Sequence, residues 1–348
     1  MKKIYLIACL LITSIFISCG GSNENEGTSQ ASSITISSTT SDAFINFPIY
    51  LSTKTNTNQD VSLTAKYYVN GNLIPGKNYT PTTTEALSIY STYTIGEVTL
   101  TSQTIEFTPK EPINFNKRVL IEDFTGTWCQ YCPRVAYAID LVSEETSNLT
   151  VVAIHRGNDP FNFAGAAVLE SQIGLRGYPL AMLNRNTEWA YPETSSTSIA
   201  QAVNMTTGLN PRLGIAMEAV TTGNTGSVNV KVKFGRTFSN LKLVVYAVED
   251  NLRANQSNST AHYGGGNPLV NFKHDNVLRA VLTNSILGEG ITGSTGYNEV
   301  FSKTFSYTIP SGVTAANVRY VAVVIDATGK ALNSRAVGPN DTQVFEID

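Results

Sequence analysis

The sequence has few charged residues, few cysteines and no long apolar segment beyond its N-terminus. Charged residues make up 15% of the 348 residues and the formal net charge is −3, whereas an average soluble protein has roughly 25% charged residues. This balance disfavours a nucleic-acid binder, which needs a broad basic face. Four cysteines are too few for a small fold held together by disulfides. Hydrophobic residues, at 42%, are enough for real cores, and the length favours a multi-domain chain.

The N-terminus has the pattern of a bacterial lipoprotein signal. Two lysines precede an apolar run, 4–17, which is shorter than the about 20 apolar residues that a transmembrane helix needs. The run ends at Ser18-Cys19, which looks like a lipobox, so we expect a signal peptide, 1–18, and lipidation of Cys19. The polar segment 19–33 is typical of a flexible tether. The alternative is an ordinary signal peptide beside which Cys19 is incidental.

Cysteine usage leaves one pair available for chemistry in the mature protein. Cys9 leaves with the signal peptide, and Cys19 would be consumed as the lipid thioether. Only Cys129 and Cys132 remain, as a C-x-x-C motif. An oxidising envelope compartment allows one intramolecular disulfide between them.

Hydrophobic periodicity divides the mature chain into three parts. Residues 34–109 alternate apolar and polar positions and carry a hairpin signal, which predicts an immunoglobulin-like β-sandwich. Residues 117–206 alternate strand and helix patterns, which predicts an α/β unit. Residues 211–348 return to strand patterns and predict a C-terminal β-sandwich. The expected fold class is therefore multi-domain β plus α/β.

The C-x-x-C motif lies where a buried strand turns into a predicted helix, 130–145. A thiol at a helix N-terminus faces unpaired N–H groups and the positive end of the helix dipole, which lower its pKa. We therefore expect Cys129 to be the nucleophile and Cys132 the resolving thiol. Asp123 lies on the strand in an apolar context, where its pKa would be raised, and it could move a proton to or from Cys132.

A proline in Tyr178-Pro179 opens a later strand and is a candidate for a cis peptide bond. The backbone beside it can present a strand-like edge to a substrate peptide. Asp123, Trp128-Cys129-x-x-Cys132 and Tyr178-Pro179 together resemble thioredoxin-like proteins in residue type, order and spacing. This resemblance implies a thioredoxin-like central domain in which Trp128 shields the nucleophile and Trp128, Tyr178 and Pro179 contact the substrate.

The sequence around the motif resembles a smaller group of proteins. The segments 119–134, 154–161 and 274–282 resemble outer-membrane lipoproteins related to outer membrane protein 28. The resemblance covers about residues 119–348. It implies a β-rich C-terminal part, a location in the outer membrane of the cell envelope and a thiol–disulfide role.

Two functions stay open. The first is a lipid-anchored thiol–disulfide oxidoreductase that acts on a protein thiol or disulfide and uses an unidentified redox partner. The second is a non-catalytic outer-membrane lipoprotein whose β domains bind a protein or glycan, with the thioredoxin-like domain as a scaffold and an inert disulfide. We expect no cofactor, no nucleic-acid partner and no metal, since His155 is the only nearby ligand that could join the two cysteines in a zinc site.

Overall fold

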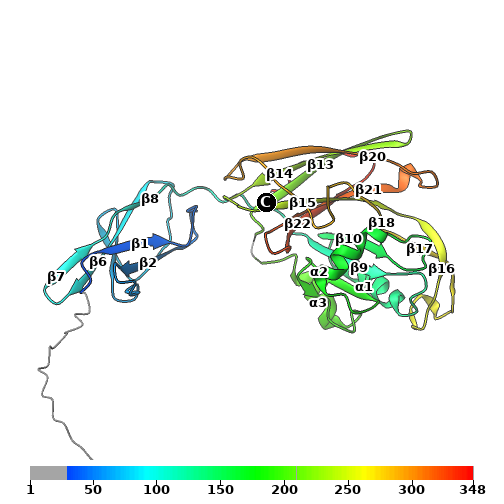
Figure 1. Ribbon diagram of the computed structural model, residues 1–348, viewed down its shortest axis with the longest axis horizontal. Helices are drawn as coiled ribbons and strands as arrows, with labels where there is room; N and C mark the ends of the chain where they lie inside the picture. The colour runs from blue at the N-terminus through cyan, green and yellow to red at the C-terminus, as the bar shows by residue number, and fades with distance from the viewer. Residues whose placement is uncertain (1–29, 209, 348) are drawn as a thin grey trace, which may run out of the picture. The chain divides into compact units, whose positions relative to one another are not determined.

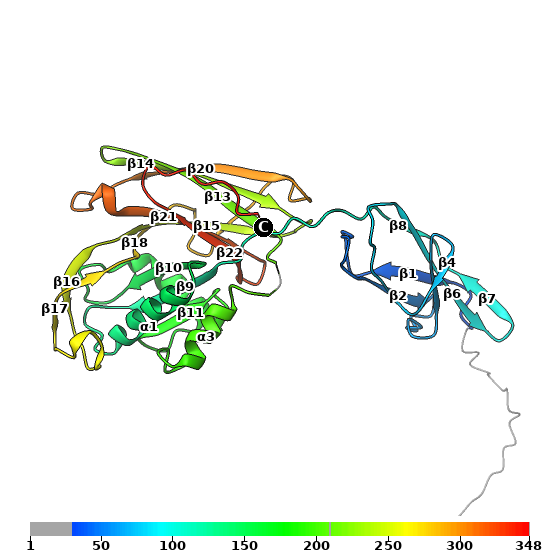
Figure 2. The same cartoon turned by 180° about the vertical axis from the view of Figure 1, so that it is seen from behind.

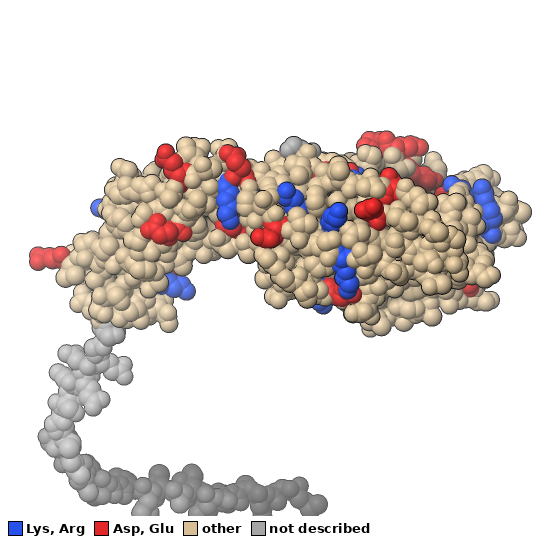
Figure 3. Space-filling view, turned by 90° about the horizontal axis from the view of Figure 1, so that it is seen from above, with Lys and Arg blue, Asp and Glu red and all other residues tan. Residues whose placement is uncertain are grey.

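The computed structural model describes residues 30–208 and 210–347. The predicted signal peptide 1–18, the predicted lipidation site Cys19 and most of the predicted tether 19–33 lie outside these residues. Within the described ranges, no helix combines the length and hydrophobicity needed to cross a bilayer. Figure 3 shows one face of the molecule, on which charged side chains are sparse and scattered, as the composition implies.

The chain divides into two compact units, and strands in two sheets form the smaller one (Figure 1). Its strands are β1 (Ile34–Ser38), β2 (Ile49–Thr55), β3 (Lys66–Val69), β4 (Asn72–Ile74), β5 (Asn78–Tyr79), β6 (Leu87–Ile95), β7 (Val98–Thr101) and β8 (Ile105–Phe107). One sheet has the order β1-β2-β5, and the other has the order β4-β3-β6-β7 with β8 also paired to β6. Alternate residues such as Tyr67 and Val69 are buried, because successive side chains of a strand point to opposite faces.

The larger unit comprises residues 41–47, 81–85 and 108–348 and is organised around a nine-stranded mixed sheet. The strands of this sheet are β9 (Val119–Thr125), β10 (Leu149–His155), β11 (Leu180–Leu183), β12 (Thr187–Glu188), β15 (Lys242–Glu249), β18 (Val277–Val281), β19 (Glu289–Gly290), β21 (Val318–Ile325) and β22 (Ala331–Val337). Their order is β12-β11-β9-β10-β18-β15-β21-β22, with β19 beside β15. β9 and β10 are parallel, and β11 pairs antiparallel to β9.

Further elements surround this sheet, and several of them are labelled in Figure 2. They are the helices α1 (Cys132–Glu145), α2 (Ala167–Ile173) and α3 (Ser196–Asn204), the short turns of 3₁₀ helix η1 (Ala164–Ala166), η2 (His262–Gly264) and η3 (Ala315–Asn317), the three-stranded sheet of β13 (Leu213–Thr222), β14 (Thr225–Phe234) and β20 (Val300–Thr308), and the two-stranded arm of β16 (Leu252–Gln256) and β17 (Leu269–His274). α1 and α3 pack on β9 and β11 in one core. The β13-β14-β20 sheet packs on β15 and β21 in another.

β15 shows why the large sheet is buried on both faces. Its odd-numbered residues from Leu243 to Ala247 pack in the core shared with β13 and β14. Its even-numbered residues from Val244 to Val248 pack with β9, β10 and α2. A strand buried on both faces reads as a continuous apolar run, and Leu-Val-Val-Tyr-Ala-Val is such a run.

The expected fold class is wrong. The described residues are mainly β-sheet, and residues 117–206 form no thioredoxin-like α/β core. β10 does not end a small sheet, since Ala153 pairs with Val277 of β18, and β18 continues into β15, β21 and β22. The segment after residue 211 therefore completes the sheet that β9 and β10 begin, instead of closing a separate C-terminal β-sandwich.

Candidate functional site

The C-x-x-C motif occupies the turn between β9 and α1. Cys132 is the first residue of α1, and Cys129 lies in the turn before it. The backbone closes this turn by hydrogen bonds from Cys129 N to Gly126 O at 3.0 Å and from Cys132 N to Cys129 O at 3.2 Å. The two sulfur atoms form a disulfide. Pro133 fits in the first turn of α1, where an N–H would have no partner within the helix.

A segment that is distant in the sequence covers this turn. Residues 256–259, from the last residue of β16 onward, donate hydrogen bonds to the carbonyl groups of the turn. The pairs are Ser257 N to Thr127 O at 2.8 Å, Ser259 N to Gln130 O at 2.7 Å and Gln256 Nε2 to Cys129 O at 2.9 Å. Cys129 is only 4% exposed. Residues 256–259 thus enclose the disulfide, and no local sequence pattern predicts this contact.

Asp123 lies on β9 behind the disulfide and is buried. Burial, and secondarily the negative charge of Glu193, raise the pKa of its carboxyl to about 8. Its Oδ1 atom has no hydrogen-bond partner among the described residues. It faces a cavity of about 60 Å³ that Cys132 and His274 also line.

His274, on β17, brings a second unsatisfied atom to the same cavity. Its Nε2 atom is buried and has no hydrogen-bond partner among the residues that the structure describes. Burial, with the neighbouring His155, lowers the pKa of His274 to about 4, so its ring is neutral at pH 7. The structure therefore brings Asp123, Cys132 and a histidine of the β16–β17 arm to one cavity.

A larger cavity of about 520 Å³ lies between α1 and the β16–β17 arm and also reaches Asp123. Its charged side chains are largely satisfied by one another. Lys273 forms an ion pair with Asp275 at 2.8 Å, and the Tyr263 hydroxyl donates to Asp140 at 2.6 Å. These internal pairs leave few charges free for a ligand.

Trp128 is 45% exposed yet held in a fixed position. Its Nε1 donates to the Arg156 carbonyl at 2.7 Å, and the ring of Tyr178 meets it edge-on at 5.5 Å between centroids. Two glycines make room for the indole. A Cβ at Gly126 would lie 2.6 Å from Trp128 Nε1, and one at Gly157 would lie 3.0 Å from it.

Tyr178 and Pro179 lie before β11, and the peptide bond between them is cis. The Tyr178 hydroxyl donates to Glu170 at 2.7 Å, and the same carboxylate pairs with Arg156 at 2.7 Å. Burial and the Glu170 carboxylate raise the pKa of Tyr178, so the hydroxyl stays protonated. Arg156 therefore links the tyrosine to Trp128, because its carbonyl holds the indole.

Two more tyrosines have exposed rings. Tyr131 is half exposed in the C-x-x-C turn, and Tyr191 is 76% exposed. The Arg134 guanidinium lies over the Tyr191 ring at 4.7 Å and pairs with Glu193 at 2.5 Å. The aromatic face is the name used below for Trp128, Tyr131, Tyr178 and Tyr191.

One comparison with known proteins shows the family of this chain. The model for outer membrane protein Omp28 matches residues 166–343, just over half of the chain. This chain belongs to the Omp28 family. The predicted resemblance to outer membrane protein 28 and the predicted location in the outer membrane of the cell envelope are confirmed, whereas the match gives no support to the thioredoxin-like part of that prediction.

Among solved structures, the fold is similar to that of HBP35 of Porphyromonas gingivalis. The TM-score is 0.53 at 16% identity, covering 66% of this chain and 77% of that chain. At this identity the similarity concerns the fold alone. No curated protein matches the chain.

Sequence reasoning named Asp123, Cys129, Cys132, Trp128, Tyr178 and Pro179, and the structure brings Asp123 close to Cys132 and Trp128 close to Tyr178. It missed the supporting residues. Gly126 and Gly157 each stand in a loop after a strand, and that position is the only local signal they carry. Gln256 and His274 reach the site through strand pairing of the arm, which is invisible in a local window.

Proposed function

We propose that this chain is a non-catalytic, lipid-anchored outer-membrane protein that binds a protein partner through its aromatic face. The observation that carries the proposal is the half-exposed but immobilised indole of Trp128. Large aromatic side chains and arginine contribute most of the energy of protein interfaces. A side chain that is already fixed loses little conformational entropy on binding.

The surroundings of Trp128 support this proposal. Its hydrogen bond to Arg156, the two glycines and the edge of Tyr178 all fix the ring while leaving much of it in solvent. Tyr191 and Arg134 add an exposed aromatic ring backed by a cation. A cluster of exposed aromatic groups on a soluble protein is typical of an interaction surface.

The burial of the disulfide argues against turnover. A catalytic thiol needs a partly exposed, electropositive environment. Cys129 is nearly inaccessible, and residues 256–259 cover the turn that carries it. The disulfide then serves to fix the shape of the turn that presents Trp128 and Tyr131.

Site-specific photo-crosslinking in intact cells tests the binding surface. A photoreactive phenylalanine analogue at Tyr191 should give a discrete protein adduct, because this side chain lies on the aromatic face. The same analogue at Val344, which is 79% exposed outside that face, is the control. Equal adduct patterns at the two positions would contradict the proposal.

A glycine substitution sharpens this experiment. Gly126→Ala places a methyl group against Trp128 and should displace the indole, so the adduct at position 191 should weaken. Gly290→Ala is the matched control, because a Cβ there meets nothing within 4 Å. Iodide quenching of fluorescence reports the displacement, since the second tryptophan, Trp189, is buried. An undiminished adduct in a displaced-indole variant would remove Trp128 from the interface.

The lipid anchor is part of the same proposal. The Ser18-Cys19 pattern supports it. Cys19→Ala should leave the signal uncleaved or release the protein from membranes, because the lipid can no longer be attached. Unchanged lipid labelling of that variant would reject the anchor.

A second candidate function is thiol–disulfide exchange. Asp123 supports it, since a carboxyl with a pKa of about 8 beside Cys132 has the proton affinity of a general acid or base near neutral pH. Cys132→Ser should then trap mixed disulfides through Cys129, and Cys129→Ser should trap few. Equal trapping by both variants would count against this candidate.

A further inference from the structure

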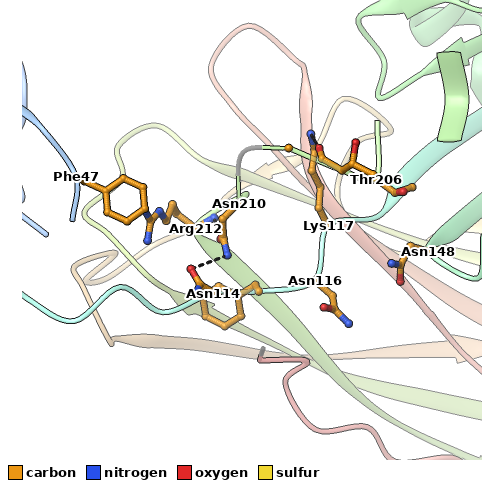
Figure 4. A pocket seen from close by; sticks show the side chains of 11 residues that line it. Phe47, Asn114, Asn116, Lys117, Asn148, Thr206, Asn210 and Arg212 are labelled. Carbon is orange, nitrogen blue, oxygen red and sulfur yellow. Dashed lines mark hydrogen bonds between the residues drawn. The ribbon is translucent and has the colours of Figure 1, made fainter. Parts of the chain in front are cut away.

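A separate cavity of about 490 Å³ lies in the larger unit where the chain enters β13 (Figure 4). It shares no lining residue with the two cavities that Asp123 lines. Its lining side chains are mostly amides and hydroxyls, with two cations and two phenylalanines. They are Phe47, Asn114, Phe115, Asn116, Lys117, Asn148, Thr206, Thr207, Asn210 and Arg212.

The charge of this cavity is positive. Lys117 and Arg212 line it, no aspartate or glutamate among the described residues does, and neither cation forms an ion pair with a described carboxylate. Burial lowers the pKa of Lys117, and the positive charge of Lys330 adds to this effect. Burial and the charge of Arg236 lower the pKa of Arg212 in the same way. Two cations are therefore held close to other cations with no opposite charge paired to them among the described residues, in a chain whose net charge is negative.

Arg212 is prepared to receive an acceptor. Its Nη1 atom is buried and has no hydrogen-bond partner among the described residues. The guanidinium lies over the ring of Phe47 at 4.3 Å and over that of Phe44 at 5.1 Å, which fixes its plane. A planar, positioned guanidinium binds a carboxylate by two parallel hydrogen bonds.

The remaining lining suits a polyhydroxylated ligand. Asn210 Nδ2 donates to Asn114 Oδ1 at 3.3 Å, the contact dashed in Figure 4, and Lys117 Nζ donates to the Thr207 carbonyl at 3.1 Å. Each amide both donates and accepts, which matches the hydroxyl groups of a sugar. The half-exposed ring of Phe47 offers an apolar surface beside them. A cavity of this volume is within the range of small-molecule sites, about 300–1,000 Å³.

We propose that this cavity binds an acidic sugar, with the carboxylate on Arg212, the positive charge of Lys117 attracting the ligand, and the ring hydroxyls on the asparagine side chains. The site is independent of the aromatic face, so it stands or falls separately from the proposed protein partner. An amide-lined site with an aromatic ring favours a sugar acid over a simple phosphate.

Isothermal titration calorimetry of the whole mature protein at low ionic strength tests this site, with glucuronate, glucose and inorganic phosphate as the probes. Glucuronate should bind measurably, and glucose at least about tenfold more weakly, since it lacks the charge-assisted hydrogen bonds. Arg212→Met should weaken glucuronate binding by about tenfold or more, and Lys117→Met should weaken it by a smaller factor. Added salt should also weaken it.

Lys231→Met is the control, because Lys231 is exposed on β14 and lines no part of the cavity. It should bind glucuronate like the wild type. Absence of glucuronate binding, equal binding of glucose, or unchanged binding by Arg212→Met would overturn the proposal. Binding of phosphate with no binding of glucuronate would also overturn it and reassign the cavity to a phosphate group.

Discussion

Arg185 and Arg212 adopt the same left-handed backbone conformation, each with φ of 58°. The two regions differ in whether a carboxylate is paired with the guanidinium. Arg185 lies in the turn between β11 and β12 with its side chain 2% exposed, and its Nε donates to both oxygens of Glu122 at 3.0 Å. The Tyr246 hydroxyl donates to the same carboxylate at 2.9 Å. Arg212 lines a cavity and has no carboxylate partner among the described residues.

The pKa shifts follow from this difference. Burial is the largest single influence on the pKa of Arg185 and lowers it, but Glu122 and Tyr246 together raise it by more, so the net shift is upward. For Arg212, burial and the neighbouring Arg236 both lower the pKa. Removing one partner of a buried ion pair is strongly destabilising, and a cation that has no partner is likewise kept at a cost in stability. Such a cost points to a ligand.

The largest effect should come from breaking the partnered group. Arg185→Met removes the cation and leaves the Glu122 carboxylate buried without an opposite charge. The free energy of unfolding should fall by about 3–5 kcal/mol. Urea unfolding of the larger unit measures this change. A loss below about 1 kcal/mol, as for an exposed ion pair, would show that water reaches the Arg185–Glu122 pair, contrary to its burial in the structure.

A smaller effect, for each unit of pH, should come from Asp123, a buried acid whose Oδ1 atom has no hydrogen-bond partner among the described residues. Its pKa is raised to about 8 from 3.8, so the native state keeps a proton that the unfolded state loses. The associated stability is complete below about pH 4 and falls as the pH rises to about 8, by up to about 1.4 kcal/mol per pH unit. Asp123→Asn cannot ionise and should lose this slope. Urea unfolding of both proteins at mildly acidic and neutral pH gives the comparison, and parallel slopes would contradict it.

The smallest effect should come from Arg212→Met. Removing a half-buried cation that has no carboxylate partner should change the free energy of unfolding by less than about 1 kcal/mol, and in the stabilising direction if the like charge of Arg236 dominates. Arg212 and Arg185 share the same backbone angle, so conformational strain cancels between the two variants. A destabilisation as large as that of Arg185→Met would mean that Arg212 is structural.

Local patterns predicted the elements around the site and missed how they assemble. The buried strand before the C-x-x-C motif and the helix after it follow from periodicity and match β9 and α1. The pairing of β10 with β18 joins Ala153 to Val277, and no local pattern encodes such a distant contact. The expected thioredoxin-like domain was wrong for this reason, since β10 does not end the sheet but pairs with β18 and, through it, joins the C-terminal strands.

The candidate site likewise has residues that the sequence predicts and residues that it does not. The motif residues Asp123, Cys129 and Cys132 could be read from the sequence because they stand close together in it. The cover of Gln256 and Ser257 could not, because it depends on where the β16–β17 arm lies in three dimensions. That cover changes the interpretation from an exposed nucleophile to an enclosed disulfide.

Reduction of insulin by dithiothreitol tests most directly whether the disulfide face acts by binding or by turnover. The mature protein is compared with the double variant Cys129→Ser, Cys132→Ser at equal concentration, and precipitation of the insulin B chain is followed by turbidity. A non-catalytic binding protein should accelerate precipitation no more than the double variant does. Acceleration that depends on both cysteines, and that diminishes in Asp123→Asn, would contradict the proposed function and establish thiol–disulfide exchange in its place.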